Sequence, residues 1–342
     1  MPFKFPFFWQ RKGLVSSLET LPLSRDVPRK DDVAYAVGRT APAVHPLLVA
    51  ELADGKIIGD LRLATTRNDV VIGDLQTIFG SDNQTNHYAL NRLRFRLPKT
   101  RRGTALLLGT ANSDNYYHWL LDSLPRWRML QAAGWQDYDF VLLHSLPRRF
   151  QEETLDWLGV PAIKRLRCSK NYIHQFHRLI VPTMPFPLEQ VAPWVCQWLR
   201  SLVAAKAAGP ERIFLSRRGA ETRRLLNEDE LQAALALRGF VTFQAEKLSV
   251  AEQAQLLSSA RMVVAPHGAA LTNLVFAPPG AWLMELFHPT HKNRCYVNLA
   301  AVCGHQYASL DGEAAPGGCP RRLEYTVDVP TVVRMVDQNL HG

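Results

Sequence analysis

The sequence of 342 residues has few cysteines, and their placement excludes a disulfide framework. The five cysteines are odd in number and widely scattered, and no CxxC pair occurs. This pattern predicts reduced thiols in a cytosolic protein. The histidines and cysteines between residues 288 and 305 do not have the spacing of a zinc site, so we expect no structural zinc there.

Long apolar runs are also missing. No run approaches the roughly 20 residues that a helix needs to cross a bilayer. The start, "MPFKFPFFWQRKG", has neither a long apolar core nor a small-residue cleavage site, so we expect no secretory signal. Its five aromatic residues between cationic ones could rest in a membrane interface. The alternative is a disordered or packed tail.

Acidic residues are outnumbered, 31 against 40 lysines and arginines, which gives a net charge of +9. This charge favours anionic partners, either an anionic membrane surface or phosphorylated ligands. Nucleic acid is not expected, because the arginines are dispersed among apolar segments and no nucleic-acid-binding module is recognisable.

The glycine-rich phosphate motifs are absent. There is no GxGxxG after a predicted strand and no GxxxxGK[ST], which argues against a standard dinucleotide-dependent oxidoreductase and against a P-loop enzyme. Asp137 and Asp139 imitate the DxD metal motif of some sugar transferases. They stand immediately before a predicted strand, at the wrong end of a parallel sheet, and we interpret them as a turn.

The sequence does contain an alternation of apolar runs and helix-like segments, beginning near residue 104. Helical periodicity covers 227–239 and 249–260, with Asn227 and Ser249 as capping residues, and the last helix starts at Pro330. The alternation predicts an α/β protein with parallel sheets covered on both faces. The predicted strands cover 104–110, 139–145, 178–183, 212–218, 240–246, 261–268 and 281–287.

A break at Gly209-Pro210 divides the chain into two predicted domains, 61–207 and 208–342. Residues 1–60 have no clear pattern, and we assign them no firm structure. Ligands of open α/β sheets bind beyond the carboxyl ends of the strands. The residues that follow each apolar run are therefore the candidates for a site.

In the second domain, several arginines follow the strand 212–218. Guanidinium groups match the geometry of phosphate oxygens, so Arg217, Arg218 and Arg223 predict an anion-binding loop. The alternative is a solvated basic loop or pairing with nearby glutamates.

The next candidate follows the strand 261–268. Gly268 allows a sharp turn and a close backbone approach, and a helix that begins there would direct its amide groups at a phosphate. His267 lies at the same mouth. Glu285, after a further strand, could accept hydrogen bonds from ribose hydroxyls. A core-facing histidine and a salt-bridged glutamate are the alternatives.

In the first domain, the helix "NYYHWLLDSLPR" places His118 and Asp122 one turn apart on one face. Asp122 is the preferred general base toward an acceptor hydroxyl, with His118 beside it; His118 could carry the proton instead. The bland alternative is a helix-surface pair of Asp122 with Arg126. The neighbouring aromatics, Tyr117 and Trp119 among them, either pack the core or offer a platform for a sugar ring.

Three motifs in this order, "NYYHWLLDSLPR", "FLSRRGAETRRLLNEDEL" and "VVAPHGAALTNLVFAPPG" followed by "MELF", resemble bacterial members of glycosyltransferase family 61, the capsular polysaccharide biosynthesis type. The resemblance covers about residues 104–310. It implies a GT-B fold, in which two Rossmann-like domains face each other across a cleft. It also implies inverting, metal-independent transfer of a sugar from a nucleotide-sugar donor, with UDP as the expected carrier.

The resemblance also implies roles for individual residues. Asp122 and His118 would be catalytic. The donor would be bound by Arg217, Arg218, Arg223, His267, Gly268, Ala269, Asn273 and Glu285, and the acceptor by Asn115, Tyr117, Trp119 and Arg126.

The expected function is therefore transfer to a glycan or lipid-linked acceptor in surface polysaccharide synthesis, in the cytoplasm at the inner face of the membrane. The alternative is a catalytically silent subunit that binds a nucleotide sugar within an assembly complex.

Overall fold

A computed structural model describes residues 47, 49–59, 61, 63–68, 98–169, 171–186, 190–203, 209–315 and 322–340. The segment 3–12, predicted to contact a membrane interface, lies outside these residues. Within them, no helix combines the length and apolar character needed to cross a membrane.

The chain divides into two compact units at Phe186, about twenty residues before the predicted boundary. The reason is helix α5 (Pro193–Ser201), which packs against η8 (Ala269–Phe276) and α8 (Cys295–Cys303) of the second unit. The Arg200 side chain of α5 also donates from Nε to the carbonyl oxygen of Val275, at 2.6 Å.

The first unit is built on one mixed sheet, ordered β3-β2-β7-β4-β5-β6, with β1 also paired to β7. The four strands β4 to β7 are parallel, whereas β1 to β3 pair in antiparallel fashion. Two of these strands lie before residue 60, where the sequence predicted no structure. The strands are β1 (Val49–Ala53), β2 (Lys56–Ile58), β3 (Leu63–Thr65), β4 (Lys99–Leu107), β5 (Phe140–His144), β6 (Arg165–Cys168) and β7 (Ile173–Pro182).

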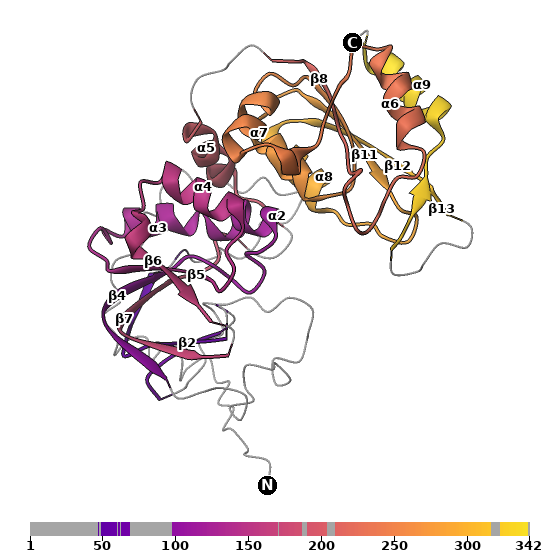
Figure 1. Cartoon of the computed structure of the whole chain (residues 1–342). Helices are drawn as coiled ribbons and strands as arrows, with labels where there is room; N and C mark the ends of the chain where they lie inside the picture. Colours follow the sequence, from indigo (N-terminus) through magenta and orange to yellow (C-terminus); the bar gives the residue numbers. More distant parts are fainter. Residues whose placement is uncertain are drawn as a thin grey trace, which may run out of the picture. The chain divides into compact units, whose positions relative to one another are not determined.

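Helices α2, α3 and α4 gather on one side of this sheet (Figure 1). From β4 the chain proceeds to β5 and β6 on one side, while β7 lies on the other side of β4, so the strand order reverses between β4 and β7. The helical segments are α2 (Tyr116–His118), a π-helical turn η5 (Trp119–Ser123), α3 (Arg126–Ala132), α4 (Arg149–Trp157) and a short 3₁₀ turn η6 (Ala162–Lys164).

The second unit has a fully parallel sheet ordered β9-β8-β10-β11-β12. The order reverses between β8 and β10, the position at which open α/β sheets bind ligands. The strands are β8 (Arg212–Leu215), β9 (Val241–Phe243), β10 (Met262–Pro266), β11 (Trp282–Phe287) and β12 (Gln306–Asp311). A small hairpin, β13 (Glu313–Ala314) with β14 (Tyr325–Thr326), follows them.

Helices cover both faces of this sheet (Figure 1). On one face, α6 (Glu228–Ala236) and α9 (Val329–Leu340) enclose a core that includes Phe214, Val264 and Met284. The other face carries α5, α7 (Val250–Leu257), η8 and α8, and a 3₁₀ turn η7 (Ala245–Lys247) follows β9. The predicted α/β class is confirmed, and it is consistent with a Rossmann-like glycosyltransferase fold. The second sheet is parallel as predicted, whereas the first is mixed because β1, β2 and β3 add antiparallel pairs.

Candidate functional site

The first candidate group is the pair of His118 and Asp122 on α2 and η5. The Asn115 side chain starts the helix by accepting a hydrogen bond from the backbone N–H of Tyr117, at 2.9 Å. One turn later, Nδ1 of His118 lies 2.6 Å from Oδ2 of Asp122. The side chain of Asp122 is 4% exposed and that of His118 is 22% exposed, so the imidazole stands between the carboxylate and the surface.

This geometry fixes how the pair handles a proton. Burial raises the pKa of Asp122, while the hydrogen bond from His118 and the charges of His118 and Arg126 lower it. When Nδ1 of His118 donates to the carboxylate, Nε2 carries the lone pair and can accept a proton. With this tautomer His118 can serve as the base and Asp122 orients it, which is the alternative that the sequence left open.

Arg126, predicted to bind the acceptor, is buried and donates hydrogen bonds to several backbone carbonyls. Nη1 donates to the carbonyl oxygens of Leu108 and Gly109, at 2.9 and 3.1 Å, after β4. Nε and Nη2 donate to the carbonyl oxygens of Thr183 and Pro182, at the end of β7. Burial lowers the pKa of Arg126 to about 9. The side chain thus ties together two strand ends, which is a structural role.

The aromatic residues of this helix also divide by burial. Trp119 is fully buried, and its Nε1 donates to Oγ1 of Thr154 on α4, at 2.8 Å. It packs the core and does not offer a surface for a sugar. Tyr117 is half-buried, and its ring lies edge-on to that of His118, with centroids 5.3 Å apart. Of the predicted acceptor residues, Asn115 and Tyr117 therefore remain accessible beside the histidine.

In the second unit, a second histidine and carboxylate pair lies at the end of β10. Nδ1 of His267 is 2.5 Å from Oε1 of Glu285, and Oε2 of Glu285 accepts from the hydroxyl of Tyr307, at 2.7 Å. Glu285 is fully buried within β11, which continues past it to Phe287. Its carboxylate therefore orients His267 instead of facing a ribose at the surface.

The most conspicuous cation of this unit is Arg217, which follows β8. Its guanidinium lies against the backbone of Gly268 after β10, so closely that a Cβ at position 268 would stand 1.9 Å from Nη1. Nη2 donates to the carbonyl oxygen of Thr222, whereas the buried Nε has no hydrogen-bond partner among the described residues. Burial lowers the pKa of Arg217, and the charge of Arg223 adds to this effect. A half-buried cation with a buried, unbonded Nε where the strand order reverses is a candidate anion site.

Gly268 has a role other than the predicted sharp turn. Its φ of 178° is extended backbone that any residue adopts. A glycine is needed here because the guanidinium of Arg217 occupies the space that a side chain would fill.

The other arginines of the loop point to different partners. Arg218 forms an exposed ion pair with Asp229 on α6. Arg223 approaches Nε2 of His291 with its Nη1, at 2.8 Å, and the His291 ring lies 5.6 Å from that of His267. Burial lowers the pKa of His291, with Arg223 as the next largest cause. His291 thus joins Arg223 as a candidate for binding the nucleotide-sugar donor. The sequence interpretation had missed His291 in this role.

The segment that follows Gly268 is the predicted helix, of the 3₁₀ type, η8. Ala269 begins it. Asn273 is fully buried, and its Nδ2 donates to Oε1 of Gln253, at 2.7 Å, and to the carbonyl oxygen of Ala270, at 3.0 Å. Asn273 therefore stabilises the segment behind the anion site.

Asp137 and Asp139, which imitate a DxD motif, lie in the loop directly before β5, the position that the sequence predicted. Asp139 stands directly before β5 and accepts a hydrogen bond from the backbone N–H of Thr104, at 2.7 Å. Within the described ranges, no three or more histidine, cysteine, aspartate or glutamate side chains group as ligands for a metal ion.

Comparison with known proteins relates these residues to a family of glycosyltransferases. A family model described as Glycosyltransferase 61 matches residues 116–284, the segment that holds His118, Asp122, Arg217 and His267. The match supports the family resemblance that the motifs predicted, without bearing on the capsular type.

Similar proteins are EGF domain-specific O-linked N-acetylglucosamine transferases. The one from Xenopus laevis is 32% identical over 143 residues, covering 37% of this chain and 27% of that protein. The one from Drosophila melanogaster is 32% identical over 138 residues, covering 36% and 26%. The match thus spans about a quarter of the length of these relatives. Together with the family 61 match, they support a glycosyltransferase enzyme.

Proposed function

We propose that this protein is an inverting, metal-independent glycosyltransferase that uses a UDP-linked sugar, with its two units as the two domains of a GT-B architecture. The observation that carries the proposal is the anion site of Arg217 and Gly268, located where the sheet order reverses and inside the family 61 match. A nucleoside diphosphate is the leaving group of such a transfer, and this site suits its charge.

In the proposed reaction, Nε2 of His118 takes the proton of the acceptor hydroxyl, and the hydroxyl oxygen attacks the anomeric carbon of the sugar. The bond between that carbon and the diphosphate oxygen breaks on the opposite side, which inverts the configuration. Arg217 stabilises the departing diphosphate by charge. When His267 carries a proton on both ring nitrogens, it donates from Nδ1 to Glu285 and from Nε2 to the diphosphate. Asp122 and Glu285 hold the two imidazoles in the orientation required.

The names of the relatives suggest the first donor to test, because they transfer N-acetylglucosamine to a protein domain. We propose UDP-N-acetylglucosamine as this donor, and a glycan or lipid-linked acceptor of surface polysaccharide synthesis. The net charge of +9 would attract the protein to the anionic inner face of a membrane, and this supports a lipid-linked acceptor.

The test is the melting temperature of the full chain with UDP and with UDP-sugars, each with and without a chelator. A ligand of the native state raises this temperature by mass action. We expect a rise that the chelator leaves unchanged and that Arg217→Ala abolishes. Arg261→Ala is the matched control, because Arg261 is exposed at the amino end of β10 and pairs with Glu211.

Three outcomes would count against the proposal. A rise that needs a divalent cation would contradict the metal-independent mechanism. A rise that survives in Arg217→Ala would move the donor to another site. Donor binding without sugar transfer to any acceptor would favour the silent binding subunit instead.

A further inference from the structure

We infer that a pocket beside β9 holds the nucleobase of the donor, and that Glu246 binds its ribose. This inference rests on the proposed function and names the part of the donor that the anion site does not contact. Nothing in the arrangement of Arg217 and Gly268 distinguishes a nucleotide from any other diphosphate. A second set of side chains must therefore recognise the nucleoside.

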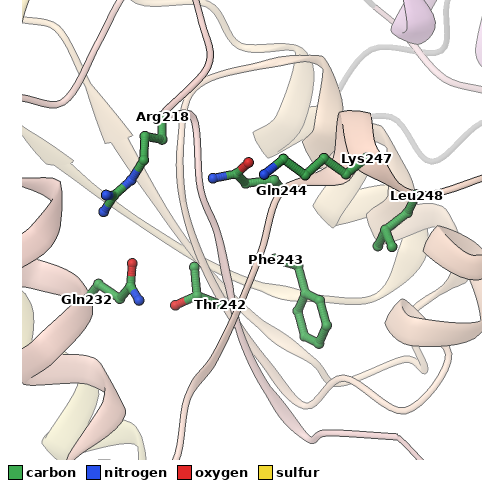
Figure 2. A pocket seen from close by; sticks show the side chains of 7 residues that line it. All are labelled: Arg218, Gln232, Thr242, Phe243, Gln244, Lys247 and Leu248. Atoms are coloured by element: carbon green, nitrogen blue, oxygen red, sulfur yellow. The ribbon is translucent and has the colours of Figure 1, made fainter.

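The pocket lies at the carboxyl end of β9, the strand next to β8 (Figure 2). Its volume is about 450 Å³, within the range of small-molecule sites. Because β8 and β9 are parallel neighbours, their carboxyl ends lie at the same edge of the sheet, and Arg217 follows β8 directly. The lining residues are Arg218, Gln232, Thr242, Phe243, Gln244, Lys247 and Leu248.

The lining has the chemistry that a nucleobase requires. Phe243 and Leu248 provide apolar surface for a flat ring. Gln232 on α6 and Gln244 after β9 each carry an amide, which offers both donors and an acceptor to the polar edge of a base. Arg218 and Lys247 add positive charge beside the phosphate site. This combination of a few polar groups on an apolar wall is typical of sites that bind small molecules in one orientation.

The ribose position follows from the topology. In dinucleotide-binding α/β folds, an acidic residue beyond the first strand and helix of the βαβ unit accepts hydrogen bonds from the ribose hydroxyls. Glu246, on η7 just after β9, is the acidic residue at that place, and it is exposed. A Cβ on Gly219 would lie 3.2 Å from Oε1 of Glu246, so the carboxylate stands against the arginine loop that follows β8.

This placement differs from the sequence interpretation, which gave the ribose to Glu285. Glu285 is fully buried between His267 and Tyr307, whereas the carboxylate of Glu246 is open to a ligand. The base pocket, Glu246 and Arg217 belong to the carboxyl ends of two adjacent strands. They correspond to the base, ribose and diphosphate of one nucleotide.

The experiment is titration calorimetry of the full chain. UDP, CDP, GDP and ADP are compared first, and the tightest binder is then measured beside its 2′,3′-dideoxy form and beside inorganic pyrophosphate. The variants are Gln244→Ala and Glu246→Gln. Their matched controls are Gln255→Ala, on the exposed side of α7, and Glu211→Gln, an exposed glutamate just before β8.

We expect both variants to bind the nucleotide about tenfold more weakly, because each loses a hydrogen bond to a charged or buried group. Both should bind pyrophosphate as the wild type does. Glu246→Gln should in addition lose most of the wild-type preference for the nucleotide over its dideoxy form. The controls should bind all three ligands unchanged.

Two results would overturn the inference, and they are distinguishable. If the wild type binds a nucleotide and both variants bind it as tightly as the wild type does, the nucleoside lies elsewhere and the proposed function stands. If no nucleoside diphosphate binds the wild type, the inference fails together with the proposed function.

Discussion

Two histidines in this protein share one design. His118 and His267 each place Nδ1 against a carboxylate that is almost or fully buried, 2.6 and 2.5 Å away. The carboxylate is removed from solvent in both pairs, whereas the imidazole of His118 is 22% exposed and that of His267 is 9% exposed. A carboxylate in that position selects the tautomer of its histidine and stabilises the charged ring. The imidazoles are therefore the groups that we expect to exchange protons or hydrogen bonds with substrate.

This design predicts the order of two mutational effects. His118→Gln should lower turnover by about 100-fold or more, because the base itself is removed. Asp122→Asn should lower it as well, by a smaller factor, since Nε2 remains. Both variants should bind the donor within a few-fold of wild type, as measured by calorimetry beside initial rates of transfer. A larger loss in Asp122→Asn would make the aspartate the base.

The buried aspartate also predicts a pH-dependent stability. Burial raises the pKa of Asp122 above its unfolded value near 3.8. The folded state then holds a proton that the unfolded state has lost. The contribution of Asp122 to the free energy of unfolding is full below about pH 3.8 and declines as pH rises through the raised pKa.

Asp122→Asn removes that decline. Its melting temperature relative to wild type should therefore increase with pH from about 4 until the raised pKa is passed, and then level off. The exposed Asp114 provides the control variant, Asp114→Asn, for which we expect no such trend. A flat difference for Asp122→Asn across this range would contradict the assignment.

At the scale of elements, local signals predicted much of the fold. Each predicted strand overlaps an observed one. Ser249, predicted as a capping residue, forms a capping box with Glu252, with N–H···O distances of 3.2 and 2.7 Å. Asn227 begins α6 as predicted. Its side chain, however, bonds to the backbone of Val327, a residue one hundred positions away.

Non-local partners explain what the sequence did not predict. Strand β12 reads "QYASLD", which lacks an apolar run because its residues are exposed or half-exposed. Without that strand, Tyr307 could not be recognised as the partner of Glu285, since the register between β11 and β12 brings them together. Local patterns locate strands and caps, but the neighbours of a buried carboxylate depend on the register of distant strands.

Arg126 gives an element-scale prediction about stability. Arg126→Met would leave carbonyl oxygens at the ends of β4 and β7 without their donor, and each buried, unsatisfied group costs about 1–3 kcal/mol. We expect the free energy of unfolding to fall by about 3–5 kcal/mol, measured by urea titration. Arg128→Met, on the exposed side of α3, should change it by less than about 0.5 kcal/mol.

Gly268 gives a second prediction at this scale. A methyl group at position 268 would displace the guanidinium of Arg217, so Gly268→Ala should weaken diphosphate binding about tenfold, or 1.4 kcal/mol. In an Arg217→Ala background the same change should have little further effect, because contacting residues act non-additively. Additive losses in the double variant would show that the glycine acts independently of the arginine.

At the scale of the whole molecule, both units contain parallel strands with one reversal of order, and an arginine stands at each reversal. In the second unit, Arg217 keeps a buried nitrogen without a protein partner among the described residues. In the first unit, the nitrogens of Arg126 donate hydrogen bonds to carbonyl oxygens at the ends of β4 and β7. Similar topology therefore offers a ligand site in one unit and a closed junction in the other.

That closed junction has a consequence for stoichiometry. The Arg126 side chain fills the position at the ends of β4 and β7 that corresponds to the nucleotide site of the second unit. Although two sheets of related design are present, calorimetry should find one nucleotide per chain, with a single class of sites. Two nucleotides bound per chain would mean that the first unit also has a nucleotide site.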